Sequence, residues 1–200
     1  MAATIMMDSA QAAARVAAAG SFRSTDHRAM LVALHSLFRA GRVPQAPLDG
    51  PYAGELITTT LGRAVDVACG ALGQVYMPWR GKVFDAAAHG GSNLFTARSK
   101  LLIRPFDPHV RDDRPGLVSA YPFATSTGPG VIDRDRTVLK IDYDLASNPF
   151  GPIRRVLDEL VEVAAGYYLG KAHLCVRGHW RTVAYFALQP GEPVSHTQTM

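Results

Sequence analysis

The chain has 200 residues, of which 48% are hydrophobic, and this is enough for one domain with a substantial core. Its net charge is +4, but its 21 Lys and Arg residues are spread along the chain and mostly lie near acids, so no nucleic-acid partner is expected. The absence of any run of about 18 apolar residues excludes a membrane span. Cys69 and Cys175 lie far apart, which indicates no disulfide framework and predicts a cytoplasmic protein.

The N-terminal residues predict helices. The Ala-rich start favours a short helix over a cleaved signal, and Thr25-Asp26 can cap a second helix over 26–40. The apolar residues of this second helix recur at the spacing of one helical face: Met30, Leu31, Leu34, Leu37 and Phe38. We expect it to close one end of the sheet described next. The stretch "VPQAPLDGP" marks a break, so residues 1–47 form the predicted helical segment.

The rest of the sequence predicts an antiparallel β-sheet that curls into a barrel, within an α+β fold. A strand over 52–60 and a helix over 61–76 come first, and from Trp79 β-branched and aromatic residues alternate with polar ones. The further strands are predicted over 80–87, 94–104, 116–124, 136–145, 166–177 and 179–188. We assign residues 48–188 to the barrel-like domain and 189–200 to a flexible tail.

One helix is predicted over residues 149–165, between the strand over 136–145 and the last two strands. It would pack outside the barrel. Asn148 is a plausible cap, and Pro149 stands where a helix tolerates proline. The apolar positions form a single helical stripe: Ile153, Val156, Leu157, Leu160 and Val161. Gly166 is suited to end it.

The strand over 136–145 has the period-two pattern of a strand with one buried face. Its apolar set is Leu139, Ile141, Tyr143 and Leu145. The opposite row of Lys140, Asp142 and Asp144 is either a solvent face or a cavity lining. Paired acids such as these could do acid–base work, and Asp142 is therefore a candidate catalytic residue.

The segment "MPWRGKVFD" over 77–85 has two interpretations. In the structural one it is the corner where the barrel begins: Trp79 plugs the barrel floor, Gly81 lets the backbone turn, Phe84 faces inward, and Arg80 and Lys82 are surface positions. In the functional one Arg80 or Lys82 binds a ligand carboxylate or phosphate at the mouth.

Two further segments carry polar groups that could bind a ligand. Lys171, His173 and Cys175 fall on one face of the 166–177 strand, and we expect this face to line a cavity because the alternating residues suit an outer face; solvent exposure is the alternative. The loop His89-Gly-Gly-Ser-Asn93 is either a turn between strands or a lid over a pocket.

Metal-binding patterns are missing from the sequence. Seven histidines are present, but no HxH, HExxH or CxxC spacing occurs, so no metal and no cofactor are expected. A haem held by His173 or His179 is the alternative.

Short motifs in the chain resemble the bacterial GXWXG family and the domain of unknown function that usually follows it. The matching residues are Gly50, Tyr52 and Gly54, then Trp79, Gly81, Lys82 and Phe84, then Tyr143-Asp144, Gly170-Lys171 and the closing "AYFAL". The resemblance spans roughly residues 48–188. It implies a small calycin-like β-barrel, in the architectural neighbourhood of lipocalins and nitrobindin-type haem barrels, with no settled activity.

The sequence leaves three functions open. The first is a barrel that binds a small apolar or amphipathic molecule. Its predicted ligand-binding residues are Trp79, Arg80, Lys82, Phe84, Phe95, Tyr143, Lys171 and His173. The second is a cyclase, isomerase or lyase of the same shape, with His173, Lys171 or Asp142 moving a proton. The third is a purely structural role, and the oligomeric state is open in all three.

Overall fold

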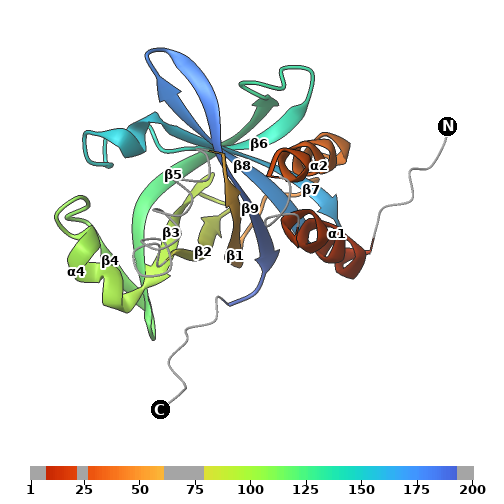
Figure 1. Ribbon diagram of the computed structural model, residues 1–200. Helices are drawn as coiled ribbons and strands as arrows, with labels where there is room; N and C mark the ends of the chain where they lie inside the picture. The colour runs from red at the N-terminus through yellow and green to blue at the C-terminus, as the bar shows by residue number, and fades with distance from the viewer. Residues whose placement is uncertain (1–7, 22–26, 61–78, 193–200) are drawn as a thin grey trace.

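A computed structural model describes residues 8–21, 27–60 and 79–192 of the chain (Figure 1). Its longer helices are α1 (Ser9–Ser21) and α2 (His27–Ala40), with short helical turns η2 (Ala97–Ser99), α4 (Lys100–Ile103) and η3 (Pro152–Arg155). The strands are β1 (Gly50–Thr59), β2 (Trp79–Asp85), β3 (Gly90–Thr96), β4 (Arg111–Arg114), β5 (Leu117–Pro129), β6 (Thr137–Asp142), β7 (Val156–Ala164), β8 (Tyr167–Val176) and β9 (His179–Pro190). None of the helices in these ranges is long and apolar enough to cross a membrane.

The strands form one antiparallel sheet in the order β3-β2-β1-β9-β8-β7-β6-β5-β4. An additional pairing of β3 with β5 closes this sheet into a barrel of eight strands, and β4 is left as an extra strand on β5. Closure removes the free edges that an open sheet would expose. The predicted antiparallel barrel is therefore confirmed, and strand is its main secondary structure.

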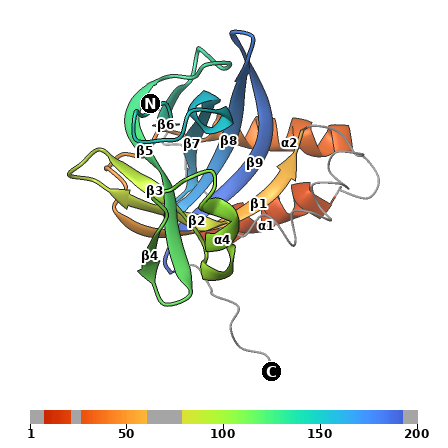
Figure 2. The same ribbon diagram turned by 90° about the vertical axis from the view of Figure 1, so that its left-hand side faces the viewer.

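Two hydrophobic clusters lie on opposite faces of the barrel wall. Inside the barrel, aromatic and aliphatic side chains pack together: Leu48, Tyr52, Phe84, Phe123, Ile141, Tyr143, Leu160, Tyr168, Phe186 and Leu188. Outside it, α1 and α2 cover β7 and β8 (Figures 1 and 2). Met30, Leu34 and Phe38 of α2 are fully buried there against Val161 and Leu169 of the strands. The predicted position of the second helix at one end of the sheet is thus wrong, because it lies along the barrel wall.

The predicted helix over 149–165 is also wrong. Its residues form the short turn η3 and then β7. The strand is buried on both faces, with Leu160 in the barrel interior and Val161 beneath the helices. A strand buried on both faces has a continuous apolar run, which matches a helical stripe as well as it matches a strand. Asn148 does not cap a helix but donates to the carbonyls of Pro122 and Tyr143, at 2.7 and 2.8 Å.

The other predicted elements agree with the structure in varying degree. Strands are present near each remaining predicted range, but the one over 94–104 ends at Thr96 and gives way to η2 and α4. The alternation in β6 is confirmed, since Ile141 and Tyr143 lie inside the barrel and Val138 lies under the helices. The helix predicted over 61–76 falls outside the described residues, as does Cys69.

Candidate functional site

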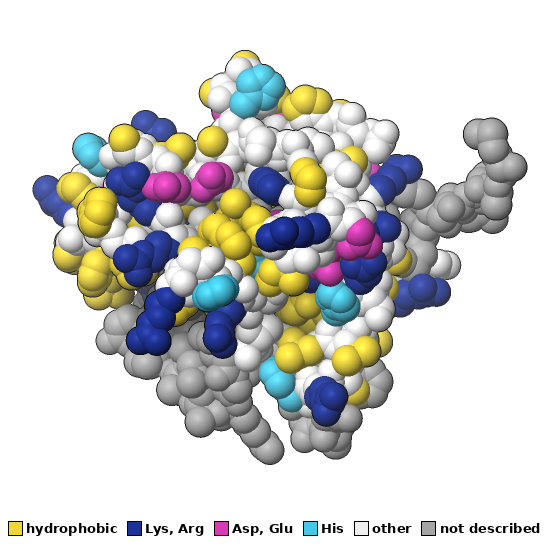
Figure 3. All heavy atoms as spheres, turned by 90° about the horizontal axis from the view of Figure 1, so that it is seen from above, with side chains coloured by type: hydrophobic (Ala, Val, Ile, Leu, Met, Phe, Trp, Pro, Cys, Tyr) yellow, Lys and Arg dark blue, Asp and Glu magenta, His cyan; other side chains and the backbone are white. Residues whose placement is uncertain are grey.

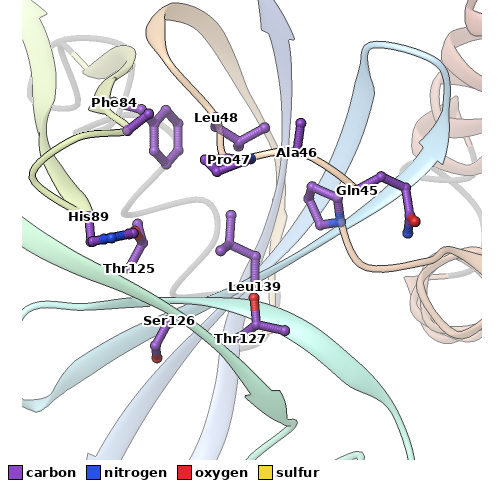
Figure 4. Close-up of a pocket in the computed structure, with 12 residues that line it drawn as sticks. Gln45, Ala46, Pro47, Leu48, Phe84, His89, Thr125, Ser126, Thr127 and Leu139 are labelled. Atoms are coloured by element: carbon purple, nitrogen blue, oxygen red, sulfur yellow. The ribbon is translucent and has the colours of Figure 1, made fainter.

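A pocket of about 350 Å³ opens at one mouth of the barrel (Figure 4). It is bounded by the segment that precedes β1, the β2–β3 turn, the second half of β5 and the middle of β6. Its lining consists of Pro44, Gln45, Ala46, Pro47, Leu48, Phe84, Ala86, His89, Thr125, Ser126, Thr127 and Leu139. Of these residues, His89 alone has a titratable side chain. One wall is therefore apolar, and the other offers neutral hydrogen-bonding groups.

The face of the molecule that carries the β5–β6 loop and the β8–β9 hairpin is mixed in character. Seen from this side, apolar side chains gather in its middle and Lys and Arg side chains lie around them (Figure 3). Lys140 lies on the outer side of this part of the wall, because its ammonium is beside Gly128 and it does not line the pocket.

Aromatic rings form the floor of the pocket. The Phe84 ring lies edge-on to Tyr52 and to Phe123, with centroid separations of 5.2 and 5.3 Å. Phe123 in turn contacts the Tyr143 ring at 5.7 Å. Edge-to-face packing of this kind is favourable beyond the area it buries. The pocket thus ends at Phe84, and the deeper barrel interior is filled by side chains.

A buried polar network lies below these rings. Lys82 is 2% exposed, and its ammonium donates to Asp158 Oδ2 at 2.9 Å, to Asn93 Oδ1 at 2.9 Å and to the Tyr143 hydroxyl. Asn93 Oδ1 also accepts a hydrogen bond of 3.1 Å from Trp79 Nε1. Each polar group of this network therefore has a partner within it, which is what burial in an aromatic interior demands.

The burial of this network shifts two pKa values. Burial lowers the pKa of Lys82, and the adjacent Asp158 carboxylate opposes that shift. Burial and the Asp158 charge raise the pKa of Tyr143 well above its usual range, so its hydroxyl keeps its proton. The ammonium also lies 5.3 Å from the Phe123 ring centroid and 5.4 Å from that of Phe186.

The structure describes residues 79–85 of "MPWRGKVFD" and tests the two interpretations for them. Trp79 packs edge-on against Phe186 at 5.7 Å, and Phe84 faces inward, as the structural interpretation predicts. The prediction of a surface position is wrong for Lys82, which is in the barrel interior. Arg80 is half-buried, and its guanidinium donates to the Trp79 carbonyl at 3.2 Å. Of the residues predicted to bind ligand, Phe84 alone lines the pocket.

The prediction that Lys171 and His173 face a cavity is wrong. Both belong to the outer face of β8, the face that α2 covers, and their exposed fractions are 1% and 0%. The interior face carries Gly170 instead, where an added Cβ would lie 2.2 Å from the Phe186 ring. Small residues on this strand therefore leave room for a large ring inside the barrel rather than for a helix outside it. Cys175, on the same outer row, is half-buried.

Lys171 joins α2 to the loop between β5 and β6. Its ammonium lies 2.5 Å from Asp133 Oδ2 and 3.0 Å from His35 Nδ1. Arg39 of α2 adds a contact of 3.1 Å to the same Asp133 carboxylate. Burial raises the pKa of Asp133, but the Lys171 and Arg39 cations outweigh this effect and hold it below its ordinary value. This cluster fixes the helix to the barrel.

Glu159 and His173 form a second buried pair beside it. His173 Nε2 lies 3.2 Å from Glu159 Oε2, both side chains are 0% exposed, and the angle falls short of a hydrogen bond. Glu159 Oε1 accepts from the Val131 amide at 2.5 Å. Burial raises the pKa of Glu159, but His173, the Val131 amide and the Lys171 charge outweigh it, so the pKa lies below its ordinary value of 4.5.

We expect the Glu159 carboxylate to make folding depend on acid pH. Because its pKa is lower in the folded than in the unfolded chain, its contribution to stability is complete above about pH 4.5 and is lost as the pH falls through the folded value. Glu159→Gln should reduce the free energy of unfolding at neutral pH and flatten its decline in acid. Urea unfolding at a series of pH values measures this. Glu55→Gln, at an exposed position in β1, is the control, and equal acid slopes in both variants would contradict the prediction.

The other candidate residues lie apart from the buried polar clusters around Lys82 and Lys171. Asp142 is half-buried on the outer face of β6 and accepts a hydrogen bond of 2.9 Å from the Asp144 amide. His89 ends the β2–β3 turn with a positive φ of 49° and lines the pocket, whereas the rest of the predicted loop, residues 90–93, belongs to strand β3. His179 is exposed at the start of β9. Within the described ranges, no group of three or more His, Cys, Asp or Glu side chains is arranged to hold a metal ion.

Sequence reasoning missed Asn93 and Asp158 as partners of Lys82, and Asp133 and Glu159 as partners of the outer cations. A usable signal was the run of apolar residues around Asp158-Glu159, since acids within such a run need buried cations. On the predicted helix both acids would have faced solvent, so that prediction gave no reason to expect buried partners for them.

Comparison with known proteins supports the fold alone. No family model matches the chain, and no curated protein matches it. A solved structure described as a protein from Thermomonospora curvata is similar, with a TM-score of 0.53 and 18% sequence identity. The alignment covers 93% of this chain and 100% of that one. At 18% identity this similarity supports the barrel fold and no statement about function.

Proposed function

We propose that the barrel binds a small apolar or amphipathic molecule in the pocket at its mouth. The observation that carries this proposal is the pocket of about 350 Å³ above the Phe84 ring, with apolar residues on one side and Thr125, Thr127 and His89 on the other. Ligand sites are usually concave and mainly apolar, with a few polar groups that orient the ligand. The ligand would place its apolar part against Leu48 and Leu139 and its polar group near His89.

Filling the pocket should abolish binding. Leu139→Trp places an indole in open space, so we expect little loss of stability and a loss of at least tenfold in affinity for a fluorescent fatty-acid probe. Ala88→Trp is the control, since Ala88 is exposed in the adjacent turn and does not line the pocket. Fluorescence titration measures the affinity, and native mass spectrometry of the purified protein would identify a co-purified ligand. Equal affinities in both variants would place the probe elsewhere.

The enzymatic alternative, a cyclase, isomerase or lyase, has no support from its candidate residues. Lys171 and His173 are enclosed under α2, and Asp142 is on the outer face of β6, so none of them reaches the pocket.

We also propose that the chain is related to the GXWXG family, that its barrel is calycin-like and that the protein is cytoplasmic. The motifs around Trp79 and Tyr143 support the first two, and the two widely separated cysteines support the third.

A further inference from the structure

A short apolar surface remains exposed around α4, far from the β8–β9 hairpin (Figures 1 and 2). Leu101 is 79% exposed, Leu102 is 51% exposed and Phe106 is 67% exposed. Three large apolar side chains within six residues are more than the isolated exposed residues common on soluble proteins. We call these three residues the α4 tip.

Cations accompany the α4 tip. Residues 97–106 include Arg98, Lys100 and Arg104 and no acid. Lys100 pairs with Asp112 at 2.6 Å, whereas Arg98 and Arg104 are exposed and have no ion pair with any other described residue. The apolar tip therefore carries two unpaired positive charges at its sides.

The α4 tip is held in place from below. Ile103 is buried with Val110, Val118 and Ala120, so the short helix has one anchored side and one projecting side. Asp107 is 1% exposed, and its carboxylate accepts from the His109 amide at 2.9 Å and from the Tyr121 amide at 2.8 Å. The tip thus needs little ordering before it binds a partner.

We propose that the α4 tip docks on the surface of an anionic lipid bilayer. Its leucines and phenylalanine would enter the boundary between headgroups and acyl chains, while Arg98 and Arg104 would lie among the phosphates, as in other peripheral proteins that combine apolar anchors with basic residues. A second copy of the chain fits less well, because a symmetric contact would bring the same unpaired arginines together. This surface is separate from the mouth pocket and does not depend on its ligand.

Vesicle co-sedimentation tests the proposal with the full chain. We expect binding to phosphatidylcholine vesicles that contain phosphatidylserine, little binding to phosphatidylcholine alone, and weaker binding as NaCl rises. Arg98→Gln/Arg104→Gln should weaken binding roughly fivefold for each charge removed. Leu101→Ser/Leu102→Ser/Phe106→Ser should abolish it. Phe150→Ser is the matched control, because Phe150 is 95% exposed in another segment of the chain, and it should bind like the unmodified protein.

Circular dichroism and urea unfolding of every variant establish that it is folded, as expected for exposed positions. Failure to bind anionic vesicles at low salt would overturn the proposal. So would binding that the triple serine variant leaves unchanged. A concentration-dependent dimer that the triple variant abolishes, without vesicle binding, would assign the tip to a second copy of the chain instead.

Discussion

Lys82→Met should lower the free energy of unfolding by about 3–5 kcal/mol, because it leaves Asp158 as an unpaired charge inside the barrel. Asp158→Asn should cost less than this but still destabilise the fold, since the Lys82 ammonium then faces only Asn93, Tyr143 and aromatic rings. The double variant should be more stable than the sum of the two losses predicts, with a coupling of about 2–3 kcal/mol.

Chemical denaturation of the single and double variants measures this coupling. Lys100→Met is the control for loss of a lysine charge, since Lys100 lies at the surface and pairs with Asp112, whose side chain is 76% exposed. A cost below about 0.5 kcal/mol for Lys82→Met would place Lys82 at a surface position, which is what the sequence predicts and the structure contradicts.

Gly81→Ala should be comparably disruptive. Gly81 has a φ of +142°, and a Cβ there would lie 1.9 Å from the Tyr52 carbonyl oxygen. That carbonyl is fixed by the pairing of Tyr52 with Lys82 in the β1–β2 ladder. Strain and overlap together should cost about 3–5 kcal/mol.

Gly128→Ala gives the contrast in the same barrel. Its backbone has no positive φ, and the nearest atom to an added Cβ is Lys140 Nζ at 3.9 Å. Alanine should there be neutral or stabilise the fold by up to about 1 kcal/mol. Thermal and urea unfolding of both variants measures the difference. Equal stabilities would show that the β1–β2 corner tolerates a side chain at Gly81.

The barrel could be predicted from the sequence because most of its strands alternate. In β6 the period-two pattern assigns Ile141 and Tyr143 to the interior, and the structure agrees. In β7 it fails, because helices cover the outer face and apolar residues occupy both sides. The inward face of β8 was equally hard to derive, because Gly170 stands at an interior position and makes room for the Phe186 ring.

The interior position of Lys82 could be derived from that of Phe84, because residues two apart in a strand lie on the same face. Trp79 obscured this, because strict alternation would place it on the other face. Between Trp79 and Gly81 the β2–β3 pairing shifts, so that these residues oppose Phe95 and Leu94, which are adjacent in β3. The extra residue, Arg80, lets Trp79 and Lys82 turn to the same side although strict alternation would separate them. Phe95, predicted to line the cavity, instead packs with Tyr121 at 5.9 Å in a separate cluster with Val118. The pocket itself depends on loops whose conformation the sequence pattern does not define.

The two adjacent acids of β7 specify the register in which this strand pairs with its neighbours. Asp158 reaches Lys82 inside the barrel, and Glu159 reaches His173 outside it. A slip of β7 by one residue would turn each acid to the opposite side of the wall and separate both charge pairs. Because β7 is apolar on both faces, hydrophobic burial would oppose such a slip only weakly. The two acids therefore fix the register of β7 from both sides of the barrel wall. Exchanging them, Asp158→Glu/Glu159→Asp, would preserve both charges and test how closely the length of each acidic side chain is matched to its own partner.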